Sequence, residues 1–543
     1  MRRASLVVVL LPALVTAQDL QKKYVALTEE WTRGAIFTKA EQEAMERGRQ
    51  WEKLMWDGLD DPLARKVLAA GEPSFEALAG LYPGKILDRT LLGTYSDPAA
   101  KPGGHDNEFV IWWNGAISAN LRPRAGHLTN LLFRVGKEAE MFGLDGRRYT
   151  RIAYEDGYLP IVTATYTHGG VRYRQSAFAW KPPAETRGAD IAYVGFEITN
   201  VSRQPQTAEL HLDVILLDGG LAKASGQAIR DPSGATLLVH SGPRARFDEK
   251  AQRLSHWFAL EPGQMARLFL KVPYAPDREG FLRAASQADF EQAHQQARGF
   301  WLELLARGTK IETPEERVNN VWRALLLQNF ILADGPRFTY GAGLQYNESY
   351  FPVENGFGGH VFALYGHTDY AGALLPYCVP VSVKPELATR KYQNRRGLPL
   401  HHVFENYRLS KKTDVYDRYK DDLYRVAEEI IRDRRSTMVE RDGARPLHWG
   451  LLPPDRPGVD LVAATQTVYV PAHNITSCQG LQDFGEFLVR SGLDPERGRR
   501  YLNEASEYRK TILDAMERSA IRVPGRPPFV DLQTLYFRDT PDF

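Results

Sequence analysis

The sequence has 543 residues, of which 43% are hydrophobic and 25% are charged, a balance typical of a globular protein with two or three domains. Its 69 Lys and Arg residues nearly balance its 67 Asp and Glu residues, so the formal net charge is only +2. A charge this small argues against nucleic acid or an acidic membrane surface as the partner.

The first residues are typical of a signal peptide. Two arginines precede an apolar run from Ser5 to Val15, and a small-x-Ala pattern ends at Ala17. The run is too short to span a bilayer as a helix, and no later segment reaches about 18 consecutive apolar residues. We therefore expect residues 1–17 to be removed and the mature protein to be secreted or periplasmic, without a membrane span.

Residues 18–84 are polar and contain many good helix formers, so we expect a helical lead-in there. Residues 85–278 instead alternate apolar and polar side chains, as in Ala208–Val214. A Gly169-Gly170 turn between two such runs is a strong hairpin signal. Short strands separated by Gly, Pro, Asn and Asp predict an antiparallel β-sandwich.

After the sandwich the hydrophobic period changes to 3.6, which indicates helices. We expect a connector helix within residues 279–310 and seven helices within residues 311–543. Thr313 and Glu316 match a capping box at the first of the seven, and Asp494 is the expected N-cap of the last.

The connections between these helices are uneven. Three connections are long, at residues 334–355, 379–398 and 438–472. The connections that alternate with them, between helices two and three, four and five, and six and seven, are short. Alternate connections in a toroid of helical hairpins lie at the same end, so the three long ones should gather at one rim. Long loops on a rigid scaffold are where function usually lies.

In this layout the sequence resembles the six-hairpin (α/α)6 glycosidases, above all their glucoamylase-like and glycogen-debranching-like members. The resemblance covers about residues 85–540 and rests on the architecture together with four short stretches, residues 341–346, 350–354, 363–367 and 450–455. It implies a β-sandwich followed by an (α/α)6-type helical toroid. A complete toroid of this type has twelve helices, so residues 311–543 are expected to be a partial toroid and the sequence a fragment.

The resemblance also implies a chemistry, glycosidic bond cleavage by two carboxylic acids, usually with inversion at the anomeric carbon. It places the general acid between the fifth and sixth helices, where Asp460, and after it Asp455, are the expected catalytic residues. The Trp-Glu-Glu signature usual in relatives is absent here, and Asp455 also fits a plain turn. No general base is assigned.

Polar and aromatic residues converge on the first long loop, a pattern typical of a sugar-binding segment. With neighbours from the other loops, the expected substrate-binding residues are Glu354, Tyr346, Glu348, Tyr350, Trp449, His402 and Arg396. Glu354 also fits a carboxylate facing a helix dipole, and Arg396 a surface turn.

Two other functions remain open at this point. An exported carbohydrate-binding protein would keep the scaffold without the chemistry, and a polysaccharide lyase would use Tyr346, Tyr350 or His402 as its base. No cofactor is expected, and no metal, because no Cys/His cluster has zinc spacing. The two cysteines, Cys378 and Cys478, are expected to be buried free thiols on helices, with a disulfide between them as the alternative in an oxidising compartment.

Overall fold

The computed structural model describes residues 89–95, 108–119, 129–145, 147–182, 190–216, 219–242, 244–274, 280–338, 352–383, 396–454, 469–520 and 528. The expected signal peptide and helical lead-in lie outside these residues. The chain falls into two compact units. The sandwich unit takes most of the chain up to Leu302 together with Thr313–Ile331, and the helical unit takes Glu303–Glu312 and the chain from Leu332 on.

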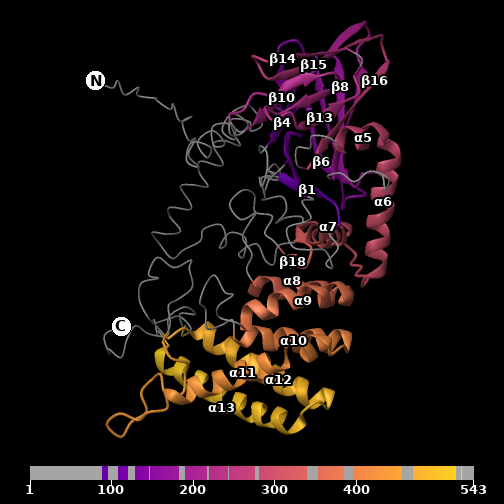
Figure 1. Cartoon of the computed structure of the whole chain (residues 1–543). Coiled ribbons are helices and arrows are strands. Elements are labelled where there is room, and N and C mark those ends of the chain that lie inside the picture. Colours follow the sequence, from indigo (N-terminus) through magenta and orange to yellow (C-terminus); the bar gives the residue numbers. More distant parts are fainter. Residues whose placement is uncertain are drawn as a thin grey trace, which may run out of the picture. The chain divides into compact units, whose positions relative to one another are not determined.

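The sandwich unit contains two antiparallel sheets of eight strands each, counted within the described residues (Figure 1). The first sheet has the order β1 (Arg89–Gly93), β2 (Glu108–Trp112), β3 (Ile117–Ala119), β4 (Thr129–Val135), β10 (Gln206–Leu216), β15 (Arg253–Leu260) and β14 (Ala245–Asp248), with β5 (Glu140–Met141) paired to β4. The second has the order β11 (Lys223–Ser225), β12 (Ala228–Arg230), β13 (Thr236–His240), β16 (Met265–Pro273), β9 (Ile191–Asn200), β8 (Val171–Trp180), β7 (Leu159–His168) and β6 (Tyr149–Glu155).

The core of this unit lies between the two sheets and follows from the alternating sequence. Leu210, Leu212 and Val214 of β10 point inward and are buried, as the period of two predicts. Aromatic rings from both sheets meet there, with the rings of Phe133 and Phe196 4.9 Å apart. The turn at Gly169-Gly170 joins β7 to β8 as predicted, and both glycines have positive φ.

Helices cover the outer face of the second sheet. An apolar cluster joins residues of this sheet, including Phe178 and Tyr193, to α5 (Gly280–Gln287) and α6 (Phe290–Arg307), and Phe281 and Ala297 are buried in it. The second sheet is therefore packed on both faces.

The next helix, α7 (Glu316–Leu332), belongs largely to the sandwich unit. The side-chain amide of Gln328 binds both the backbone N–H and the backbone carbonyl of Leu91, at 3.2 and 3.1 Å. The predicted capping box is wrong. The hydroxyl of Thr313 donates to the carbonyl of Glu315 and bonds the side chain of Asn319, and it does not cap the helix.

The helical unit begins with a small hairpin of β17 (Ala333–Asp334) and β18 (Arg337–Phe338) and continues as three helical hairpins within the described residues. Their helices are α8 (Pro352–Leu364), α9 (Thr368–Val383), α10 (Gly397–Ser410), α11 (Asp414–Ser436), α12 (Pro471–Ser491) and α13 (Pro495–Ser519). This architecture confirms the predicted fold class, antiparallel β-sheets followed by a helical region. None of the described helices is both long and apolar enough to cross a membrane.

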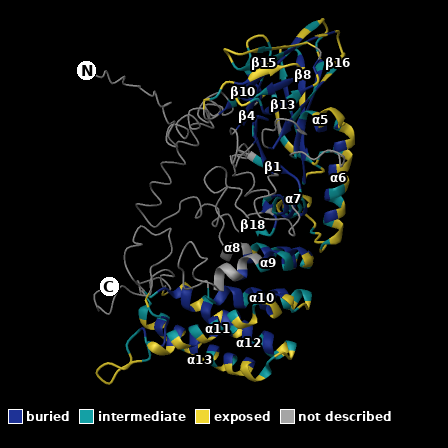
Figure 2. Ribbon diagram, viewed as in Figure 1, coloured by how far each residue is buried: buried dark blue, intermediate teal, exposed yellow. Residues whose placement is uncertain are grey.

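The three hairpins form two layers (Figure 1). Helices α8, α10 and α12 pack side by side in one row, and each is followed in the chain by an antiparallel partner in the other row. Apolar side chains fill the space between the rows, among them Phe404, Leu481 and Tyr508. Figure 2 shows the result, helices with a buried face and an exposed face.

The helices of the first row run parallel to one another. Gly397 of α10 lies against Gly480 of α12, and further along the two helices the rings of Tyr407 and Phe487 are 5.1 Å apart. On the other side of α10, the rings of Phe357 and His402 are also 5.1 Å apart, and about one turn further along both helices Nδ1 of His360 lies 3.5 Å from Oε2 of Glu405. The first residues of α8, α10 and α12 therefore lie at the same end of the row.

Candidate functional site

One face of the first helical row is polar. We call it the polar face and define it by its members on two helices, His401, Glu405 and Arg408 of α10 with Gln479, Asp483 and Glu486 of α12. On each helix these positions are four and three residues apart, which places them on one side. The apolar positions between them, such as Val403 and Phe484, pack into the core between the rows.

A histidine and a carboxylate meet across the polar face. The Nδ1 atom of His401 lies 2.6 Å from Oδ2 of Asp483, and the amide of Gln479 donates to the other carboxylate oxygen at 2.7 Å. An ionised carboxylate only accepts hydrogen bonds, so Nδ1 of a neutral His401 carries the proton and Nε2 is the basic nitrogen. The side chain of Asp483 is 5% exposed and that of His401 is 23% exposed, so the histidine is the accessible member.

A second carboxylate lies one helical turn further along α10. Glu405 accepts two hydrogen bonds at 3.1 Å from Nε of Arg408 and one at 2.5 Å from its Nη2. Its Oε2 is also 3.5 Å from Nδ1 of His360 on α8. Burial is the main cause that lowers the pKa of His360, and the nearby Glu405 opposes that change. His360 is therefore neutral near pH 7.

This arrangement can move a proton. A buried carboxylate that holds an imidazole by one nitrogen fixes the ring orientation and leaves the other nitrogen to act as acid or base. Within the residues that the structure describes, no group of three or more His, Cys, Asp or Glu side chains is placed to hold a metal ion.

Of the predicted site residues, His402 is buried rather than presented on the polar face. Its side chain packs against Phe357, and the residue is 4% exposed. Gly356 makes room for it, since a Cβ atom there would lie 2.1 Å from Nε2 of the ring. The adjoining cavity, which Asn406 also lines, is only about 10 Å³ and is too small for a sugar.

Arg396 and Trp449 both have partners within the helical unit. The guanidinium of Arg396 forms an ion pair with Asp433 of α11. The guanidinium of Arg445 lies 4.1 Å from the ring centre of Trp449, which is half-buried. The Trp449 ring is therefore partly covered by a guanidinium from its own connection.

The chain that follows Trp449 is anchored at the start of α12. The backbone N–H of Leu452 donates to Oδ1 of Asn474 at 2.8 Å, and the hydroxyl of Tyr508 donates to the same oxygen at 2.6 Å. Pro454 is the last described residue before Asp455. The described chain is therefore fixed near the start of α12 two residues before it ends at Pro454.

Both expected catalytic residues, Asp460 and Asp455, lie outside the described residues, as do Tyr346, Glu348 and Tyr350. Glu354 lies in the first turn of α8, and its side chain is outside the description. The catalytic and substrate-binding assignments of these residues stay predictions.

The sequence reasoning did not single out His360, Glu405 or Asp483. A signal was present, because His401 and Glu405 are four residues apart, as are Gln479 and Asp483, within helices whose other faces are apolar. The predicted free thiol is confirmed for Cys478, which is buried on α12, and burial raises its pKa to about 11. The side chain of Cys378 is outside the description.

The fold and the polar face together define a protein with a β-sandwich, helical hairpins and a histidine held by a buried carboxylate. No known family profile matches the sequence. No curated protein matches it either.

Solved structures show weak likenesses. A protein assigned as a kojibiose phosphorylase from the human microbiome matches at 12% identity and a TM-score of 0.42, over 78% of this chain and 66% of that chain, which is just under two thirds of its length. A family GH92 α-mannosidase from Bacteroides thetaiotaomicron matches at 10% identity and a TM-score of 0.28, over 80% and 73%. A polysaccharide lyase matches at 12% identity and a TM-score of 0.18, over 79% and 83%. Likenesses of this size do not identify an activity.

Proposed function

We propose that this chain is a carbohydrate-active enzyme that hydrolyses a glycosidic bond at the N-terminal end of the row α8, α10 and α12. The observation that carries the proposal is the parallel course of these three helices. Each of them begins after one of the three long segments of the sequence, so all three segments lead into the same end of the row. Those segments contain Asp455, Asp460 and the aromatic residues predicted to bind sugar.

In the proposed mechanism Asp460 is the general acid, with Asp455 as the second choice. A glycosidase of the inverting kind protonates the leaving oxygen with one carboxylic acid and activates water with another carboxylate. Tyr346, Glu348, Tyr350, Glu354 and Trp449 are proposed to bind the sugar. His401, held by Asp483, is proposed to relay protons on the polar face beside that site.

The test is hydrolysis by the full chain and by two variants, Asp455→Asn and Asp460→Asn. Each sugar of a panel of neutral polysaccharides is incubated with the protein, and the release of reducing ends is measured. Loss of the general acid should lower the rate by at least about 100-fold. Asp442→Asn is the control, because Asp442 is exposed in a turn within the same long connection.

Activity that survives both changes would show that the acid lies elsewhere. If the unchanged protein hydrolyses no glycan but binds oligosaccharides, it is a carbohydrate-binding protein instead.

The pair of His401 and Asp483 also favours a second candidate, a polysaccharide lyase. A lyase needs a base that removes a proton next to a uronate, and an imidazole held by a carboxylate suits that task. The product of β-elimination is unsaturated and absorbs ultraviolet light. An increase in that absorbance on a uronate polymer, lost in His401→Gln, would establish the lyase in place of the hydrolase.

Secretion is part of the proposal. The basic and apolar residues before Ala17 support export, with the mature chain starting near residue 18. The N-terminal sequence of protein recovered from the periplasm or the medium tests it.

A further inference from the structure

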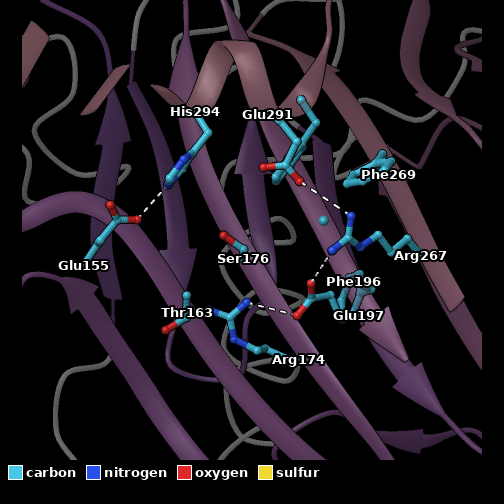
Figure 3. Close-up of a pocket in the computed structure, with 12 residues that line it drawn as sticks. Glu155, Thr163, Arg174, Ser176, Phe196, Glu197, Arg267, Phe269, Glu291 and His294 are labelled. Carbon is cyan, nitrogen blue, oxygen red and sulfur yellow. Dashed lines mark hydrogen bonds and ion pairs between the residues drawn. The ribbon is translucent and has the colours of Figure 1, made fainter. Parts of the chain in front are cut away.

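The sandwich unit carries a pocket of about 250 Å³ on the outer face of its second sheet, beside α6 (Figure 3). The pocket follows from the register of four strands. Thr163 of β7 pairs with Ser176 of β8, Ser176 pairs with Gly195 of β9, and Gly195 pairs with Phe269 of β16. Because the first three of these residues are small, the sheet is hollow along this row.

Larger side chains border the hollow. In the next row Arg174, Glu197 and Arg267 pair across β8, β9 and β16. On the other side α6 contributes Phe290 and His294, and the Phe290 ring lies so close to Gly195 that a Cβ atom there would be 2.9 Å from it. The hollow therefore has a floor of small residues between a charged wall and an aromatic one.

The floor offers two hydroxyl groups that bond no other described side chain or backbone group. Neither Thr163 nor Ser176 makes a side-chain hydrogen bond to another described residue. Figure 3 shows Ser176 between the group formed by Glu155 and His294 and the group formed by Arg174 and Glu197. Both hydroxyls are half-buried and can each donate and accept.

The charged wall is also only partly used. Arg174 and Arg267 each donate one hydrogen bond to Glu197, at 3.2 Å, and their side chains are 49% and 48% exposed. Arg267 also forms a longer ion pair, 4.0 Å, with Glu291 of α6. A guanidinium has five N–H donors, so most of them are left for a ligand. The sheet and α6 are also linked at the edge of the pocket, where the carboxylate of Glu155 lies 2.7 Å from Nε2 of His294 and forms an ion pair with Arg298.

We propose that this pocket binds one neutral sugar unit of a glycan, at a site separate from the proposed catalytic end of the helical unit. The volume is slightly below the roughly 300–1,000 Å³ of pockets for drug-sized ligands, so it suits a single sugar ring. The two arginines and the three carboxylates that line the pocket, Glu155, Glu197 and Glu291, carry a formal net charge of −1. The site therefore provides donors, acceptors and aromatic rings without favouring an anion, which is the chemistry of a ligand with many hydroxyl groups.

The test measures binding of maltose, cellobiose and mannobiose to the full chain by calorimetry and by saturation-transfer NMR. The double variant Thr163→Val and Ser176→Ala removes both hydroxyls with little change in shape. It should weaken the binding of the preferred sugar by about tenfold, since two hydrogen bonds are lost. The control is Thr167→Val, on the same strand and sheet face but outside the pocket.

Three results would overturn the proposal. In the first, none of the three sugars binds saturably. In the second, the double variant and the control bind the sugar with equal affinity. In the third, the protein binds glucuronate or inorganic phosphate more tightly than the neutral sugars. The proposed hydrolysis fails separately, because it depends on Asp455 and Asp460. The two sites are separate if Asp455→Asn or Asp460→Asn abolishes hydrolysis and the floor substitutions, added to that variant, still weaken sugar binding tenfold.

Discussion

The two units build their polar sites in different ways. In the sandwich unit the pocket arises from register, since Thr163, Ser176 and Gly195 come from three strands and become neighbours only when the sheet pairs correctly. In the helical unit each half of the polar face is local, because His401 and Glu405 are one turn apart on the same helix. Only the meeting of the two halves, α10 with α12, depends on long-range packing. Polar residues in a helix can thus be grouped from sequence, whereas those in a sheet need the strand order.

The largest expected effect is on the packing that joins α10 to α12. A Cβ atom on Gly397 would lie 2.0 Å from the carbonyl oxygen of Thr476, which is backbone and cannot move aside easily. Gly397→Ala should therefore lower the free energy of unfolding by about 3 kcal/mol or more, as overpacking in a core does. Urea denaturation measures it.

The control for this change is Gly372→Ala in α9. A Cβ atom there has its nearest neighbour at 3.9 Å, so the change should stabilise the protein by up to about 1 kcal/mol through helix propensity. Equal effects at Gly397 and Gly372 would refute the close contact between α10 and α12.

The sandwich unit should respond to acid through His256. This imidazole is buried in the core and its ring lies 5.0 Å from that of His240. Burial, and second the neighbouring His240, lowers the pKa of His256 to about 4. The folded state then binds fewer protons than the unfolded state, so stability is complete above about pH 6.5 and falls by about 3 kcal/mol as the pH drops to 4.

The measurement is the free energy of unfolding against pH for the parent and for His256→Phe. In His256→Phe the free energy of unfolding should depend much less on pH between pH 6.5 and 4 than it does in the parent. Phe258→Leu, on the same strand, should reduce stability equally at every pH, because it removes core volume without a titrating group. A slope that is the same in His256→Phe and the parent would contradict the prediction.

The next effect concerns Asp483, which acts in the proposed enzyme as a positioning residue. Asp483→Asn removes the charge that holds His401 and should lower kcat by about 100-fold, equal to about 2.7 kcal/mol, with little change in KM. The dependence of kcat on pH should change as well. Rates and pH profiles measure both.

Glu429→Gln is the control, since Glu429 lies on α11, outside the polar face, and forms an ion pair with Arg425 of its own helix. An Asp483 variant with the rate and pH profile of that control would exclude His401 from the reaction.

The floor variants of the sandwich pocket should leave kcat on a short substrate unchanged, which separates the two units.

The smallest effect is at a helix start. The carboxylate of Asp494 accepts a hydrogen bond from the backbone N–H of Arg497 at 3.1 Å, and the hydroxyl of Tyr424 donates to it at 3.2 Å. Asp494→Ala should reduce the free energy of unfolding by about 1–2 kcal/mol. Thr413→Ala, at the start of α11, should cost less than about 0.5 kcal/mol, because Thr413 makes no capping bond to the backbone. Thermal unfolding of both variants tests the difference.

The sequence by itself determined the local elements. Alternation of apolar residues predicts β10, the glycine pair predicts the turn between β7 and β8, and Asp494 marks the start of α13. These features depend on a few neighbouring residues and on backbone preferences that act at short range. The capping box at Thr313 was predicted from a similar short pattern and is wrong. The hydroxyl of Thr313 bonds the side chain of Asn319 and so does not cap the helix.

Only the tertiary structure decided which of these elements meet. His401 and Asp483 are 82 positions apart, and they bond because two glycines let α10 and α12 approach closely in parallel. Likewise, the pairing order of β7, β8, β9 and β16 sets small residues in one row and charged residues in the next. Both outcomes depend on long-range packing, which the periodicity of a single segment does not encode.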